Sequence, residues 1–193
     1  MTHNDVRIAK ASEQQTVLNT LMLAFATDPP LRYLFATPDA YLAGFPRFAT
    51  AMGGGPLAAG TAYLADGAAA LWLPPGVESD QVALGALVAE LVAPETLPVM
   101  GQVVEAIAHY HPHEPHWYLA LIGVDPARQG LGLGSAVLKE TLQRCDADGL
   151  IAYLESSSPK NIPLYERHGF EVMGVIQPGD FPPLYPMLRP ARR

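Results

Sequence analysis

The stretch Gln129-Gly130-Leu131-Gly132-Leu133-Gly134 follows an apolar run, residues 117–124, and precedes a segment of helical spacing that begins at Ser135. A strand, a glycine-rich turn and a helix in this order place backbone N–H groups at the positive end of the helix. Such a cluster of N–H groups is a docking point for phosphate. We therefore expect the chain to bind a phosphorylated small molecule at this turn.

Two familiar nucleotide-binding motifs do not fit the turn. A Rossmann fingerprint needs Gly-x-Gly-x-x-Gly, whereas the glycines here are Gly130, Gly132 and Gly134, so the third comes one residue early. The Lys-Ser/Thr ending of a P-loop is absent as well. A plain tight turn remains as the alternative interpretation of the glycines.

The turn does match the pattern Gln-x-x-Gly-x-Gly from Gln129 to Gly134, with Val124-Asp125-Pro126 before it. In this pattern the chain resembles the GNAT superfamily of acetyl-CoA-dependent N-acetyltransferases. The resemblance is dense over residues 105–176 and extends to the puromycin N-acetyltransferase-like branch of that superfamily. Further segments that carry it are residues 114–119, 154–156 and 161–170.

The chain as a whole predicts an α/β (α+β) protein with a single domain, residues 1–193. Periodicity and turn residues predict strands at 6–9, 61–65, 68–73, 117–124, 150–154, 170–176 and 184–188. They predict helices at 12–25, 39–51, 79–91, 95–110, 134–147 and 161–167, the first with a capping box from Ser12 to Gln15. Residues 29–35 read as an irregular, proline-rich connection. The resemblance implies the GNAT fold, a mixed and mostly antiparallel sheet of about six or seven strands, splayed between strands four and five and flanked by helices on both faces.

The resemblance also implies where acetyl-CoA, the cosubstrate, would bind. The strand that ends at Val124 diverges from the strand 150–154, so its main chain is free to pair with the pantetheine arm. The amides of the glycine turn would surround the pyrophosphate, and Asn161 would contact the pantetheine region. The expected coenzyme-binding residues are Ile122, Gly123, Val124, Gln129, Gly130, Leu131, Gly132, Leu133, Gly134, Ser135, Asn161 and Tyr165.

Tyr165 is the expected general acid. It lies four residues after Asn161, so the two side chains share one helix face. The resemblance implies that this tyrosine protonates the departing thiolate, a role that suits a phenol with an ordinary pKa of about 10. The amine would attack the thioester directly, with a backbone N–H near Ile122 to Val124 stabilising the oxyanion. The alternative for Tyr165 is a purely packed side chain.

The general base is less defined, because Tyr118 occupies the position where the histone-modifying branch has a glutamate. Glu155, at the end of a strand, is the first candidate, and a hydrogen bond in the cleft wall is its alternative role. A histidine such as His116, or water, could serve instead. The histidines at 109, 111, 113 and 116 lack a metal-binding spacing, so no metal is expected. The lone Cys145 reads as a structural or surface thiol.

The amino-acid composition limits the classes of partner that the chain is expected to bind. The formal net charge is −7, which gives no basic surface for nucleic acid or for anionic membranes. One cysteine, no signal peptide and no apolar run long enough to span a bilayer predict a soluble, cytoplasmic protein. Between Arg47 and Arg128 there are acidic residues but no Lys or Arg. These acids could attract a cationic acceptor, or they could simply keep the helix faces soluble. The oligomeric state, monomer or homodimer, stays open.

Three functions are compatible with these features. The leading hypothesis is acetyl transfer to the primary amine of a small molecule, for example an antibiotic or an aminonucleoside. The alternatives are a protein or peptide N-acetyltransferase and a non-catalytic acetyl-CoA sensor. Tyr33, Phe35, Trp72 and Tyr110 are either an aromatic acceptor wall or core. A small-molecule enzyme would close the acceptor side with the segments around Tyr33 and Tyr110, whereas a protein acetyltransferase needs an open groove.

Overall fold

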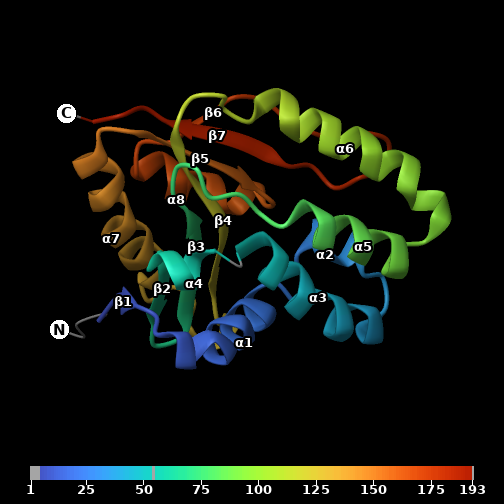
Figure 1. Cartoon of the computed structure of the whole chain (residues 1–193), viewed down its shortest axis with the longest axis horizontal. Coiled ribbons are helices and arrows are strands. Elements are labelled where there is room, and N and C mark those ends of the chain that lie inside the picture. The colour runs from blue at the N-terminus through green and yellow to red at the C-terminus, as the bar shows by residue number, and fades with distance from the viewer. Residues whose placement is uncertain (1–4, 54, 193) are drawn as a thin grey trace.

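A seven-stranded mixed sheet runs through the computed structural model, which describes residues 5–53 and 55–192 (Figure 1). The strand order is β1-β2-β3-β4-β5-β7-β6, and only β4 and β5 are parallel neighbours. The strands are β1 (Arg7–Ile8), β2 (Ala62–Ala65), β3 (Ala68–Leu73), β4 (His116–Val124), β5 (Ile151–Ser156), β6 (Glu171–Val172) and β7 (Tyr185–Arg189). The predicted fold class is confirmed.

Helices cover both faces of this sheet. The helices are α1 (Gln14–Ala24), α2 (Pro29–Leu34), α3 (Pro38–Gly53), α4 (Pro56–Ala59), α5 (Gln81–Leu91), α6 (Leu97–Tyr110), α7 (Leu133–Asp148) and α8 (Ile162–Arg167). Short 3-10 turns are η1 (Ala11–Glu13), η2 (Pro94–Thr96), η3 (Pro126–Arg128) and η4 (Pro159–Asn161). Within the described residues, no helix combines the length and the apolar character needed to cross a membrane.

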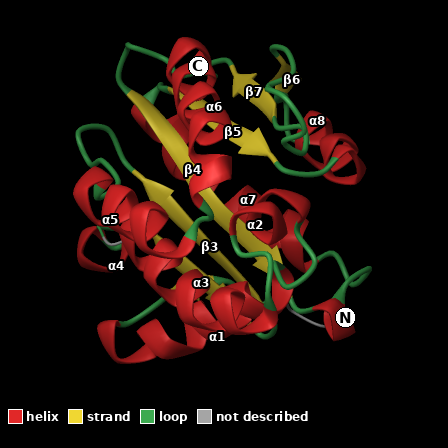
Figure 2. Ribbon diagram, turned by 90° about the vertical axis from the view of Figure 1, so that its right-hand side faces the viewer, coloured by secondary structure: helices red, strands yellow, loops and turns green. Residues whose placement is uncertain are grey.

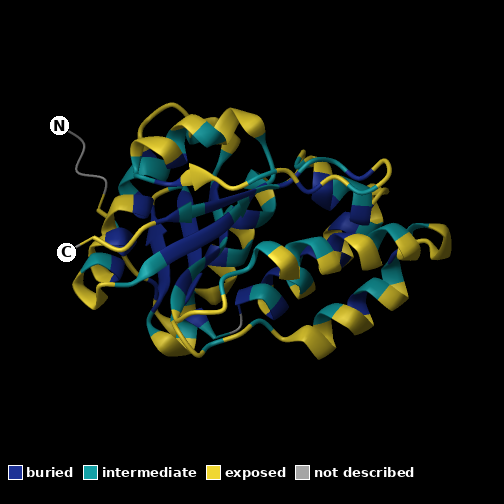
Figure 3. Ribbon diagram, turned by 90° about the horizontal axis from the view of Figure 1, so that it is seen from above, coloured by how far each residue is buried: buried dark blue, intermediate teal, exposed yellow. Residues whose placement is uncertain are grey.

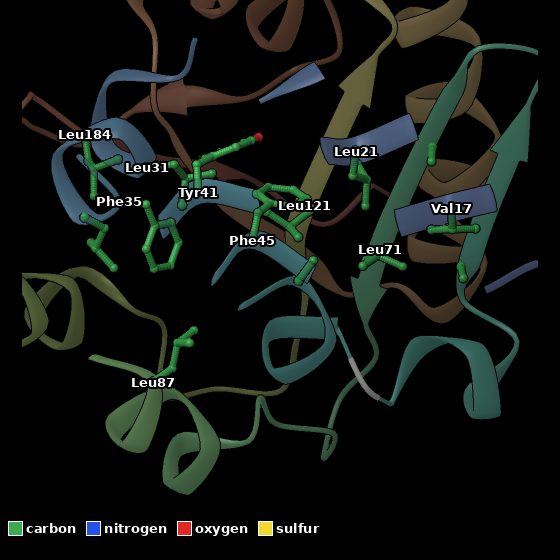
Figure 4. Close-up of a cluster of buried hydrophobic side chains, with 14 of the residues drawn as sticks. Val17, Leu21, Leu31, Phe35, Tyr41, Phe45, Leu71, Leu87, Leu121 and Leu184 are labelled. Carbon is green, nitrogen blue, oxygen red and sulfur yellow. The ribbon is translucent and has the colours of Figure 1, made fainter. Parts of the chain in front are cut away.

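Each face of the sheet has its own core, and the strands between them are buried (Figure 3). The first core joins α1, α2, α3, α5 and α6 to the sheet and contains Phe35, Phe45 and Leu121 (Figure 4). The second core packs α7 and Tyr165 of α8 against the other face and contains Trp72. Phe35 and Trp72 have no exposed surface, so both are core residues and not acceptor wall.

A bulge in β4 changes which face its side chains meet. Trp117 and Leu119 belong to the second core, whereas Leu121 belongs to the first, although residues two apart in a regular strand share a face. The register against β3 explains this, because Trp72 pairs with Leu119 while Leu71 pairs with Leu121. One extra residue, Ala120, therefore lies at the centre of β4.

The strands β4 and β5 diverge after Tyr118, just before the bulge (Figure 2). They pair only where residues 116–118 of β4 meet residues 151–153 of β5, while β4 stays paired with β3 as far as Val124. The predicted opening between the fourth and fifth strands is confirmed. The main-chain groups of β4 past the bulge therefore have no pairing partner in β5.

Two local expectations near the N-terminus are wrong. The predicted Ser12–Gln15 capping box does not form, because the Glu13 carboxylate accepts a hydrogen bond from the Lys10 N–H at 2.9 Å instead. Residues 29–35 are not irregular, because Pro29 to Leu34 form α2. Proline at the first helical position fits the helix, and the residue before it, Asp28, supplies the N-cap.

Candidate active site

The glycine turn between β4 and α7 has the backbone shape that phosphate binding requires. Gly130 and Gly132 have φ of 80° and 79°, a left-handed conformation that glycine adopts without strain, and Gly132 is the N-cap of α7. A Cβ added at either glycine would meet nothing within 4 Å, so the space above the turn is open. The first main-chain bond of α7 runs from Ala136 to Gly132, so the amides of residues 133–135 lie in positions without an intrahelical partner.

Contacts with the β2–β3 hairpin and with β4 hold this turn in place. The Gln129 side-chain amide donates to the Val124 carbonyl at 3.3 Å, and the Asp125 N–H donates to the Gly67 carbonyl at 2.8 Å. Arg128 lies 2.7 Å from Asp66 in the hairpin turn. Leu131 is exposed at the tip, whereas the Leu133 side chain is buried in the second core. Leu133 can therefore offer only its main chain to a ligand at the turn.

The part of β4 that no longer pairs with β5 contains Ile122, Gly123 and Val124. The side chains of Ile122 and Val124 pack toward the second core. Gly123 faces α1 so closely that an added Cβ would lie 2.5 Å from the Ala24 Cβ. Glycine is therefore required here for α1 to approach the sheet, while the strand edge stays available for main-chain pairing.

Tyr165 lies in the second core with 5% of its surface exposed, and its ring packs edge-on against Phe170. Burial, and then the negative charge of Asp28, raise the pKa of its hydroxyl well above 10. The phenol is therefore protonated at neutral pH, as a proton donor must be. Asn161 is exposed at the end of η4, and Leu164 packs partly buried against the second core.

Asp28 is a partly buried acid that the sequence motifs do not mark, and it contacts the loop after β5. One oxygen, Oδ1, accepts a hydrogen bond from the Leu31 N–H at 3.1 Å and so caps α2. The other oxygen accepts a hydrogen bond from the Ser157 hydroxyl in the loop after β5. Asp28 thus ties α2 to the far side of the opening. An aspartate followed by Pro29-Pro30 is an N-cap signal that could have identified it.

Replacing Asp28 tests this link. Asp28→Ala should lower the free energy of unfolding by about 1 kcal/mol, and Asp28→Asn by less, because asparagine caps helices equally well. Burial raises the pKa of Asp28 above its ordinary 3.8, so its protonation favours the native state. That contribution is complete below about pH 4 and is lost as the pH rises through the raised pKa. Wild type should therefore lose stability relative to Asp28→Asn as the pH rises above about 4, measured by urea unfolding. An unchanged difference would contradict the buried charge.

Glu155 lies on the first-core side of β5, with its side chain 8% exposed. Its Oε2 accepts a hydrogen bond from the Tyr118 hydroxyl at 2.8 Å, and its Oε1 has no hydrogen-bond partner among the described residues. The His111 Nδ1 lies 3.9 Å from Oε1. Burial, followed by the charge of Glu155, raises the pKa of Tyr118 well above 10. Tyr118 is therefore a proton donor to the carboxylate and not a base.

The histidines at 109, 111, 113 and 116, between the end of α6 and the start of β4, separate into two groups. His111 and His116 contact each other through their Nε2 atoms at 3.0 Å, and His116 Nδ1 lies 2.8 Å from the Glu114 carbonyl. His109 and His113 are exposed. The remaining candidate nucleophile, Cys145, is fully buried, and burial raises the pKa of its thiol to about 12. A thiol of this kind is not a nucleophile at neutral pH.

The segment between β6 and β7 contacts both α2 and α6. The Tyr33 hydroxyl of α2 donates to Asp180 Oδ1 at 2.7 Å, and its ring packs edge-on against Phe181. Helix α6 runs along the same segment, with Tyr110 against Gly174 and Val99 near Gly179 (Figure 1). Both segments that were expected to close a small-molecule site therefore contact the same stretch of chain.

Comparison with known proteins identifies the family of this chain. The model of the acetyltransferase (GNAT) family matches residues 61–170, which is more than half of the chain. An uncharacterised N-acetyltransferase of Schizosaccharomyces pombe is 43% identical over 54 residues, 28% of this chain. The match spans only 22% of that relative's length.

Solved structures share the whole fold. The protein described as histone acetyltransferase HPA2 and related acetyltransferase from Corynebacterium glutamicum is 25% identical, with a TM-score of 0.71 over 97% of this chain and 96% of its own. A polyamine N-acetyltransferase of Drosophila melanogaster is 14% identical, with a TM-score of 0.57 over 95% of this chain and 97% of its own. Members of the matched family use acetyl-CoA as cosubstrate. The chain therefore belongs to the acetyltransferase (GNAT) family.

Proposed function

We propose that the chain, as a single domain, transfers the acetyl group of acetyl-CoA to the primary amine of a small molecule. The closure of the acceptor side carries the small-molecule part of this proposal. Tyr33 and Tyr110 bring α2 and α6 against the segment between β6 and β7, and these contacts would narrow the groove that a folded protein needs beside the site. A small amine does not need such a groove.

The site fits the coenzyme. The open space above Gly130 and Gly132, at the positive end of the 16-residue helix α7, suits a pyrophosphate group. The main chain from Ile122 to Val124 would pair with the pantetheine arm, and Asn161 would contact it. Bound there, acetyl-CoA supplies an activated thioester carbonyl between β4 and β5.

The side chains around the opening can move the two protons of the reaction. Glu155 first takes one proton from the protonated amine, and the neutral amine nitrogen then bonds to the acetyl carbon. A backbone N–H near Ile122 to Val124 donates to the developing negative charge on the carbonyl oxygen. The C–S bond breaks, and the Tyr165 hydroxyl gives its proton to the sulfur. The nitrogen then loses its second proton, and that proton returns to the Tyr165 oxygen through water. The chain forms no covalent bond to the acetyl group.

The charges near the site favour a cationic amine. Glu155, Asp28 and Asp180 all lie on the side where α2 and α6 close the opening. They would attract a protonated amine before it loses its proton. The Drosophila structure named as a polyamine N-acetyltransferase has the same fold, and the puromycin N-acetyltransferase-like segments point to related amines.

Protein or peptide acetylation is the second candidate. It is favoured by the Corynebacterium structure, which is described as histone acetyltransferase-related. An acetyl-CoA turnover screen over polyamines, arylalkylamines, aminonucleosides, antibiotics and peptides decides between the two. Release of CoA with small amines alone supports the proposal. Acetylation of peptides alone would replace it, and tight coenzyme binding without any acetyl transfer would make the chain a sensor.

Glu155→Gln tests the proposed base. We expect kcat at pH 7 to fall about tenfold with the KM for acetyl-CoA unchanged, because part of the amine can still lose its proton in solution. The loss should shrink at higher pH, where more of the amine is neutral. Glu114→Gln, at an exposed position in the same region, is the matched control and should behave as wild type. Equal kcat for both variants would remove Glu155 from the mechanism.

A further inference from the structure

A cluster of five polar and aromatic side chains connects Glu155 to the surface. Its members come from the end of α6, from β4 and from β5. They are His111, His116, Tyr118, Tyr153 and Glu155, called here the His111 cluster. The His111 ring packs edge-on against the rings of His116, Tyr118 and Tyr153, with centroid distances of 4.8, 5.0 and 4.9 Å. These three rings fix the position of the imidazole.

Hydrogen bonding determines which nitrogen of His111 is free. The Glu114 carbonyl can only accept, so His116 Nδ1 must carry the proton of that 2.8 Å bond. Burial lowers the pKa of His116, so this ring is neutral at pH 7 and its Nε2 is an acceptor. The 3.0 Å contact then requires the proton on His111 Nε2. The lone pair of neutral His111 is therefore on Nδ1, which faces Glu155.

The surroundings of His111 suit a group that takes up a proton. Its Nδ1 lies 3.9 Å from Glu155 Oε1, so a movement of about 1 Å brings the two atoms within hydrogen-bond distance. His111 is also the C-cap of the 14-residue helix α6, where the helix dipole favours positive charge. The charged and titratable groups that face it are Glu155 and Tyr153 from β5 and His116 and Tyr118 from β4.

We propose that His111 carries the proton of the acceptor amine away from Glu155, and that His116 is a positioning residue that holds His111 in the required tautomer. This inference rests on the proposed acetyltransferase function. Glu155 Oε1 gives its proton to His111 Nδ1, and His111 Nε2 gives one to His116 Nε2. His116, which is only partly buried, loses a proton to water. Each ring gains and loses one proton, and exchange with solvent restores both tautomers, so the net change is one proton moved from Glu155 to solvent.

The assignment gives the helical segment between β3 and β4 a part in the chemistry. Helices α5 and α6 form that segment, and His111 follows the last residue of α6. The same helix that closes the acceptor side would thus also deliver a proton carrier to Glu155. An exit of this kind matters because a base that keeps its proton cannot serve the next turnover.

His111→Ala tests the inference, with His113→Ala as the matched control on the same segment. We expect the kcat of His111→Ala at neutral pH to fall about tenfold, with the KM for acetyl-CoA unchanged. Turnover of this variant should rise with the concentration of imidazole buffer, because free imidazole can replace the missing ring. Wild type and His113→Ala should show no such dependence. A merely structural role of His111 would not produce rescue by imidazole.

The outcomes separate this inference from the proposed function. If wild type acetylates an amine and His111→Ala matches it in kcat without any buffer dependence, the proton path is wrong while the acetyltransferase function stands. If wild type acetylates no amine, the proposed function itself fails. Should His111→Ala not fold, His111→Gln decides the question, since glutamine can still donate to His116 but takes up no proton. If His111→Gln has the same kcat as wild type, the inference is overturned.

Discussion

Tyr165→Phe is expected to lower kcat for amine acetylation by about 10²- to 10⁴-fold, with little change in the KM for acetyl-CoA. Only the hydroxyl is lost, and the ring still packs against Phe170. The departing thiolate then has no proton donor, so the charge on sulfur is left to water. The free energy of unfolding should change by about 1 kcal/mol or less, because one hydroxyl is removed.

The raised pKa of Tyr165 adds a pH signature to this prediction. Burial first, and then the charge of Asp28, keep the hydroxyl protonated well above pH 10, so wild-type kcat should show no alkaline decline at the ordinary pKa of a tyrosine. The matched control is Tyr185→Phe, a partly buried tyrosine of β7, which should keep wild-type kcat. Steady-state kinetics from pH 6 to 10 with all three proteins is the measurement. Equal kcat in Tyr165→Phe and wild type would reject the acid role.

Local signals in the sequence predict most of the fold. The Asp66-Gly67 turn places β2 beside β3, and the left-handed Gly149 ends α7 where the helical spacing stops. The glycine turn could be predicted as a strand-to-helix turn because its conformation depends on residues that are adjacent in the chain. The same holds for the helix of Tyr165, which the pattern from Asn161 to Gly169 predicts within one residue at its start.

What the sequence could not predict depends on residues that are distant in the chain. The bond between Asp28 and Ser157 joins positions 129 residues apart, and the bond between Tyr33 and Asp180 joins positions 147 apart. The contact of His111 with Glu155 likewise depends on the path of α6 across the sheet. The bulge at Ala120 has no turn residue to mark it, because its cause is the register between β3 and β4. Each of these features depends on contacts that form only in the tertiary fold, so no local pattern in the sequence predicts it.

Gly132→Ala should weaken the binding of acetyl-CoA by about 10- to 100-fold, which corresponds to losing one hydrogen bond to a charged group. With φ of 79°, an alanine at this N-cap is strained by about 1–2 kcal/mol, and its Cβ would project into the open space above the turn. The pyrophosphate could then no longer approach the amides at the start of α7. Strain alone would lower stability without this effect on binding.

Gly149→Ala separates the two effects, because the same helix has a second left-handed glycine at its other end. Gly149 has φ of 64°, and a Cβ there also meets nothing within 4 Å, so both variants should lose a similar free energy of unfolding. Only Gly132→Ala should lose coenzyme affinity, measured by titration calorimetry with acetyl-CoA and with CoA. Equal affinity of the two variants would mean that the amides at the start of α7 do not hold the pyrophosphate. The assignment of residues 129–135 to the coenzyme would then fail, because those amides are the groups through which the turn would bind it.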